Sequence, residues 1–155
     1  MVFEVFCSAE TKPDWQSRAI MKALKCNYSH VGFLVNGVQI FHSTGEGVNE
    51  KYVDSFLTDH VFIERLDITK YVINPQFFLG WLKGNIGKDY SESQYLGFIN
   101  KNWRKFASDG RSEMICSEFG ARGIDECTVI PIFDNVNCDF VDPVGFMNEL
   151  RKIVL

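Results

Sequence analysis

Residues 30–42 have the sequence HVGFLVNGVQIFH, and this stretch decides the expected fold. Two runs of strand-forming residues flank Asn36-Gly37, and Asn-Gly is the favoured pair for a two-residue hairpin turn. The stretch therefore predicts an antiparallel hairpin. A two-residue turn places Val31 opposite His42 across this hairpin.

Two of the three histidines, His30 and His42, lie at the open end of the predicted hairpin. A regular ladder with a two-residue turn puts their rings on opposite faces, because successive residues of a strand point to opposite sides. A bulge, or a turn one residue longer or shorter, brings both rings onto one face. There, one imidazole can take a proton while the other fixes its tautomer.

Hydrophobic periodicity and turn residues predict further short elements on both sides of the hairpin. The expected strands cover 1–7 and 61–68, the expected helices cover about 15–25, 50–58, 75–82, 91–106, 113–124 and 143–150, and a Gly-rich loop covers 43–50. This mixture predicts an α+β protein, with a small antiparallel sheet or half-barrel packed against helices. The 155 residues fit a single domain over 1–155.

Composition excludes several classes of protein. Hydrophobic residues make up 46% of the chain and charged residues 23%, which is ordinary globular usage. The net charge of −4 argues against nucleic acid as the main partner, since phosphate binding needs a basic surface. No signal peptide or apolar run long enough for a membrane span is visible, so we expect a cytoplasmic protein. A viral or phage origin would suit the small size.

The five cysteines are odd in number and contain no Cys-x-x-Cys pair. We therefore expect reduced thiols, no zinc site and no cofactor. Cys116 differs from the others because it lies near the predicted start of the helix over 113–124. Unpaired backbone N–H groups and the helix dipole favour a thiolate at such a position, and a nearby imidazole lowers the pKa further. By position alone, Cys116 is either a candidate nucleophile or a buried thiol that acts as a small apolar residue.

Five short motifs occur in one order along the chain: YSHVGF at 28–33, FHSTGEGV at 41–48, GKDY at 87–90, ICSEF at 115–119 and DP at 142–143. In this order and spacing the chain resembles the permuted papain-like cysteine hydrolases of the NlpC-type superfamily. The similar branch includes lecithin:retinol acyltransferase-like enzymes and bacterial YiiX-like proteins, in which the histidine strand precedes the cysteine helix. The resemblance spans about residues 28 to 150 and implies a circularly permuted papain-like fold.

The resemblance also implies roles for individual residues. Cys116 would be the nucleophile, His30 the base, and His42 the third catalytic residue that orients His30. Glu46 is the alternative for the third position, because the similar enzymes use His, Glu or another polar residue there. Tyr90 would contribute to the oxyanion or substrate site.

Ser117, next to the nucleophile, is a second candidate for the oxyanion or substrate site, together with the backbone N–H of Cys116. The implied chemistry is hydrolysis of amide or peptide bonds, including cell-wall-derived peptides, with ester, thioester or lipid-acyl chemistry second. The alternative is a non-catalytic binding or structural protein on the same scaffold, in which the 14 phenylalanines form a partner surface.

Four remaining residues have structural expectations. His60 is expected on the surface before a strand. Glu118 is expected to point away from the nucleophile, because it follows Cys116 by only two residues on a helix. Gly45 and Gly47 are expected to form turns or to let a substrate approach the backbone.

Overall fold

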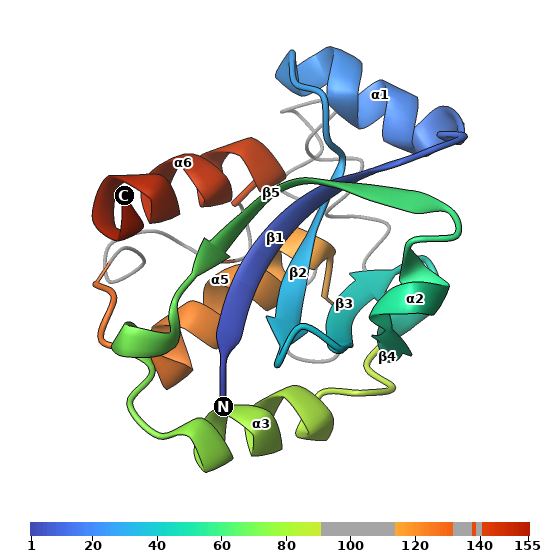
Figure 1. The fold of residues 1–155 in the computed structure, drawn as a ribbon. Helices are drawn as coiled ribbons and strands as arrows, with labels where there is room; N and C mark the ends of the chain where they lie inside the picture. Colours follow the sequence, from blue (N-terminus) through green and yellow to red (C-terminus); the bar gives the residue numbers. More distant parts are fainter. Residues whose placement is uncertain (91–113, 132–137, 139–140) are drawn as a thin grey trace.

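The computed structural model describes residues 1–90, 114–131, 138 and 141–155. Across these residues the chain forms an open antiparallel sheet with the strand order β4-β3-β2-β1-β5 (Figure 1). The strands are β1 (Phe3–Glu10), β2 (His30–Val35), β3 (Gln39–Thr44), β4 (Gly47–Tyr52) and β5 (His60–Asp67). The expected α+β class, a small antiparallel sheet packed against helices, is confirmed.

The described helices are α1 (Trp15–Leu24), α2 (Val53–Phe56), α3 (Pro75–Gly84), α5 (Cys116–Cys127) and α6 (Pro143–Val154), and η1 (Thr69–Tyr71) is a 3-10 turn. Helices α1, α3 and α6 each begin after a residue whose side chain accepts a backbone hydrogen bond at the helix N-terminus, namely Asp14, Asn74 and Asp142 respectively. This agrees with the preference for Asp and Asn at that position, from which the sequence predicts these helices. The helix expected over 91–106 lies outside the described residues. None of the described helices has the length and hydropathy that a membrane span requires.

Helices cover the two faces of the sheet unequally. Helix α5 packs across β2 and β3, with α3 and α6 beside it, and this layer encloses the larger hydrophobic core (Figure 1). The other face carries a small buried cluster of Phe6, Leu34, Ile40 and Phe56, to which α2 contributes the last.

The hairpin turn is one residue longer than expected. Val35 pairs with Gln39, so the turn contains three residues, and Gly32 rather than Val31 lies opposite His42. Asn36 is held in a left-handed conformation, with φ of 53°. Its side-chain oxygen accepts a hydrogen bond from the backbone N–H of Val2 at 2.9 Å, and its own N–H donates to the Val2 carbonyl at 2.9 Å. These two bonds to a distant segment fix a turn that local propensity alone does not select.

The prediction of a Gly-rich loop over 43–50 is wrong. Strand β3 continues to Thr44, β4 begins at Gly47, and only two residues turn the chain between them. Gly47 has φ of 94°, and a Cβ atom there would lie 2.4 Å from the carbonyl oxygen of Lys88. The N–H of Val48 donates to the same carbonyl at 2.8 Å. Gly47 thus allows the segment around Lys88 to approach the sheet.

A β-bulge interrupts the pairing of β1 with β5. Cys7 pairs with Glu64, whereas the next residue, Ser8, pairs with Phe62, so one residue of β5 is skipped. Because side chains alternate between the two faces, skipping one residue moves the β5 side chains beyond the bulge to the opposite face relative to β1. As a result, His60 lies opposite Glu10 and shares the face of the sheet that carries His30.

Candidate active site

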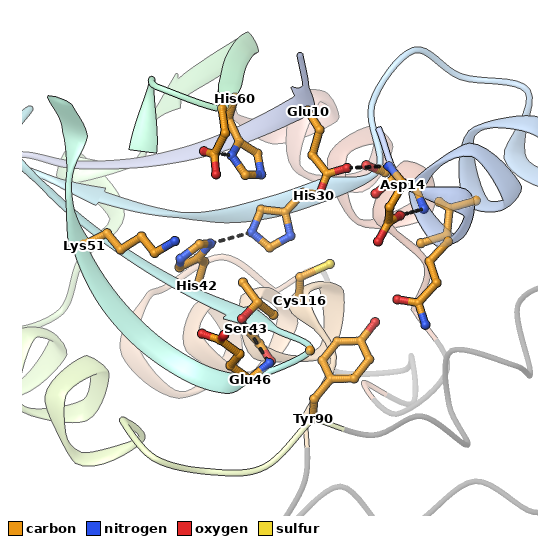
Figure 2. A pocket seen from close by; sticks show the side chains of 17 residues that line it. Glu10, Asp14, His30, His42, Ser43, Glu46, Lys51, His60, Tyr90 and Cys116 are labelled. Carbon is orange, nitrogen blue, oxygen red and sulfur yellow. Dashed lines mark hydrogen bonds and ion pairs between the residues drawn. The ribbon is translucent and has the colours of Figure 1, made fainter. Parts of the chain in front are cut away.

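A pocket of about 310 Å³ opens at one end of the sheet. Because the strands are antiparallel, the ends of β1 and β3 and the starts of β2 and β5 meet at this end. They bring Glu10, His42, His30 and His60 into one pocket, which the first residue of α5, Cys116, also lines (Figure 2).

The two histidine rings that the sequence placed at the hairpin's open end are in contact. His30 Nε2 lies 2.8 Å from His42 Nδ1, and the ring centroids are 4.9 Å apart. This contact requires both rings on one face of the sheet. The three-residue turn meets that requirement, because it makes Gly32 the partner of His42 and so places His30, two residues earlier, on the same face.

Cys116 begins helix α5 and approaches His30 from the other side. Both residues line the pocket, and in the view of Figure 2 the sulfur of Cys116 lies on the side of the His30 ring away from His42. The segment before Cys116 is tied to the sheet, since the hydroxyl of Ser43 donates to the carbonyl of Met114. The hydrogen bond of His30 Nε2 to His42 leaves Nδ1 of the same ring for the thiol.

Small residues let α5 lie close against the sheet, which places Cys116 at the pocket. A Cβ atom at Gly123 would lie 2.6 Å from Cζ of Phe33, and one at Gly120 would lie 2.9 Å from Cζ of Phe146. Phe119 packs its ring edge-on to Phe33 at 5.6 Å between centroids and stacks on Trp81 at 5.3 Å. The helix is therefore fixed by close packing on its inner face.

Both histidines are kept neutral by their surroundings. Burial lowers the pKa of His30 well below its ordinary value, and the nearby His42, His60 and Lys51 act in the same direction. Burial also lowers the pKa of His42 to about 4, with Lys51 and His60 adding to the effect and the Asn49 side chain opposing it. At neutral pH each ring therefore has one donor and one acceptor nitrogen.

The thiol of Cys116 is neutral as well. Only 6% of Cys116 is exposed, and burial raises its pKa to about 11, although hydrogen bonds from the backbone N–H groups of Val31 and Ser117 act in the opposite direction. This contradicts the expectation that the helix N-terminus and an imidazole would favour a thiolate. Desolvation of the sulfur outweighs both effects in the free protein.

The other candidate residues lie at different distances from the chemistry. Tyr90 and Glu46 both line the pocket, but Glu46 is exposed, and among the described residues its carboxylate makes no hydrogen bond to either histidine ring. The side chain of Ser117 is fully buried and is not part of the pocket lining. Its backbone N–H, next to Cys116, is the group available at the site.

Sequence reasoning missed the third histidine. His60 lines the pocket with its side chain 12% exposed, its Nδ1 lies 2.6 Å from Oδ1 of Asp59, and its ring centroid is 6.1 Å from that of His30. The expectation of a surface residue before the strand is wrong, because β5 begins at His60 and the bulge turns the side chain inward. Phe56 stacks on the ring at 4.3 Å between centroids.

Glu118 has a structural position, as expected from its place on α5. Its side chain is fully buried and forms an ion pair with Arg122 at 2.7 Å, one helical turn later. The five cysteines are all free thiols. Within the described ranges no cluster of His, Cys, Asp and Glu could hold a metal ion.

This arrangement, with a thiol at a helix start beside a pair of hydrogen-bonded imidazoles, defines a site of the kind that nucleophilic catalysis uses. Comparison with known proteins adds no assignment. No family model matches the chain, and no curated protein matches it either.

Proposed function

We propose that this protein is a cysteine hydrolase that cleaves amide or peptide bonds, or the related ester and thioester bonds. The observation that carries the proposal is the contact of 2.8 Å between His30 Nε2 and His42 Nδ1 in the pocket that also holds Cys116. Two neutral imidazoles in series, one fully buried and one partly buried, lie in one pocket with a thiol and provide a base and a group that orients it.

The neutral resting state indicates how the first step proceeds. As the sulfur of Cys116 forms a bond to the carbonyl carbon, its proton passes to Nδ1 of His30, and His42 accepts a hydrogen bond from Nε2–H of that ring. In this proposal the backbone N–H groups of Cys116 and Ser117 donate to the oxyanion, with Tyr90 at the pocket wall. This general-base path does not need a thiolate before the substrate binds.

Two further proton transfers complete the turnover. His30 gives its proton to the leaving amine, alcohol or thiol as the tetrahedral intermediate collapses to an acyl thioester on Cys116. Water then attacks the thioester, His30 takes one proton from it, and the carboxylic acid leaves while the thiol is restored. Each step uses the same ring nitrogen, so a ring held in one orientation serves both halves of the reaction.

The order of elements supports a circularly permuted papain-like fold as the scaffold. The histidine strand β2 precedes the cysteine helix α5, and a long antiparallel sheet packs on that helix. The second candidate function is a non-catalytic binding protein on this scaffold. The low exposure of Cys116 and its raised pKa favour that candidate, because they slow the reaction of the thiol with any electrophile.

Alkylation by an alkyne-bearing iodoacetamide at neutral pH, mapped by mass spectrometry, separates the two candidates. For an enzyme, Cys116 labels faster than the partly buried Cys26, and His30→Ala slows labelling of Cys116 on the order of a hundredfold. Hydrolysis of an acyl thioester should fall in parallel. Cys26→Ser is the matched control and should change neither rate.

Circular dichroism of each variant shows whether the fold is kept. Labelling of Cys116 that is no faster than that of Cys26 and that is unchanged by His30→Ala, with no hydrolysis, would contradict the enzyme and support the binding protein.

A further inference from the structure

The pocket around Cys116 is charged unevenly. Glu10, at the end of β1, and Asp14, at the start of α1, lie together on one side of Cys116, while Lys51 lies on the other side, next to His42 (Figure 2). A substrate bound across the sulfur would therefore meet negative charge on the α1 side. The carboxylates on this side therefore affect which ligands the pocket binds.

The two carboxylates are held by backbone groups. Glu10 Oε2 accepts a hydrogen bond from the N–H of Asp14 at 3.0 Å, and Asp14 Oδ1 accepts one from the N–H of Ser17 at 2.7 Å. Within the described ranges neither carboxylate forms an ion pair with a lysine or arginine. The backbone N–H groups of Asp14 and Ser17 already donate to these carboxylates and are not available to an anion, so this wall of the pocket favours a cation.

A largely buried serine lines the same pocket. Ser29, which directly precedes β2, is 5% exposed and lines the pocket with Glu10, Asp14 and Ser17. Its backbone N–H donates to Ser8, but in the described part of the chain its hydroxyl has no hydrogen-bond partner. Its oxygen is not fully buried, so a ligand in the pocket can accept a hydrogen bond from it or donate one to it.

From these observations we infer that Glu10, Asp14 and Ser29 form a subsite for a cationic group of the substrate, such as the ammonium of a lysine side chain or of a peptide N-terminus. The inference rests on the proposed function, because it places this group beside the bond that Cys116 attacks. An ammonium offers three N–H donors, which match two carboxylates and one hydroxyl. The preferred substrates are then positively charged amides or peptides.

Three methanethiosulfonates that differ only in the charge of their side chain test the subsite: the 2-aminoethyl, the ethyl and the 2-sulfonatoethyl reagents. Each forms a disulfide with Cys116 and releases methanesulfinate, while the thiol proton passes through His30 to solvent. We expect the order cation, neutral, anion for Cys116. The rate ratio of the cationic to the neutral reagent should exceed the same ratio at Cys26, measured in the same sample.

Isosteric variants locate the effect. Glu10→Gln and Asp14→Asn keep the acceptors for the backbone hydrogen bonds, and each should lower the cation-to-neutral ratio at Cys116 by about threefold, the effect of one charge roughly 6 Å away in water. Glu149→Gln removes a carboxylate that is paired with Lys152 on α6, outside the pocket, and should leave the ratio unchanged. Added salt should weaken the preference.

The outcomes distinguish the subsite from the proposed function. Reaction of Cys116 with all three reagents, at a ratio that neither Glu10→Gln nor Asp14→Asn changes, would overturn the cationic subsite and leave the hydrolase in place. No reaction of Cys116 with any of them would overturn both.

Discussion

Acid should destabilise this protein through its histidines, above all the fully buried His42. The pKa of His42 is lowered to about 4 in the folded state, whereas an unfolded histidine titrates near 6.5. Between these values the unfolded chain binds more protons than the folded one, so stability falls as the pH falls. Above about pH 6.5 both states are neutral at this position and His42 contributes no pH dependence.

The size of the effect follows from the two pKa values. For His42 alone, the loss of unfolding free energy is about 2 kcal/mol at pH 5 and approaches about 3 kcal/mol below pH 4. His30 adds to this loss, because its pKa is also lowered. Against a total stability of roughly 5–15 kcal/mol for a domain, such a change is easily measured.

Urea unfolding followed by circular dichroism and tryptophan fluorescence at pH 8, 6.5 and 5 is the assay. The wild-type midpoint should fall steadily between pH 6.5 and 5, with the slope of the transition unchanged. His42→Gln removes the titrating group, so its loss between pH 8 and 5 should be smaller by about 2 kcal/mol. A wild-type stability that is flat over this range, or the same pH dependence in His42→Gln, would refute the reasoning.

Three further outcomes are expected. The rate of Cys116 alkylation should still be rising at about pH 9.5, because its pKa is raised to about 11, and a plateau near neutral pH would show a preformed thiolate. His42→Ala should keep the fold and retain part of the hydrolase activity, with partial rescue by Gln, while Glu46→Gln should be nearly silent; the reverse pattern would make Glu46 the orienting residue. Gly123→Ala should lower the unfolding free energy by about 1–2 kcal/mol, measured by urea unfolding, because its Cβ would meet the ring of Phe33.

Local signals predicted much of the scaffold. Asn36-Gly37 predicted the hairpin. Asp14 and Asn74 precede helices, as their capping preference suggests, and Cys116 is the first residue of α5. Each of these features depends on residues close in sequence, where intrinsic preference and structure agree. For the same reason His30, His42 and Cys116 could be named as candidates without coordinates.

The geometry of the site depends on contacts that no local pattern contains. The register of the hairpin is set by hydrogen bonds between Asn36 and Val2, which are 34 residues apart. His60 enters the pocket because a bulge between β1 and β5 skips one residue. The pKa of Cys116 follows its burial by packing across the whole domain, so helix position alone predicted the wrong direction.

The order in which the parts occur along the chain matters during synthesis. All strands of the described sheet lie within residues 3–67, and Cys116 follows them by almost fifty residues. A ribosome therefore releases the paired histidines and their sheet well before the thiol, and domains fold from the N-terminus as they emerge. Until α5 arrives, the apolar face that carries Val31 and Phe33 lacks its main cover. Chains interrupted before α5 should thus carry both imidazoles, lack Cys116 and aggregate.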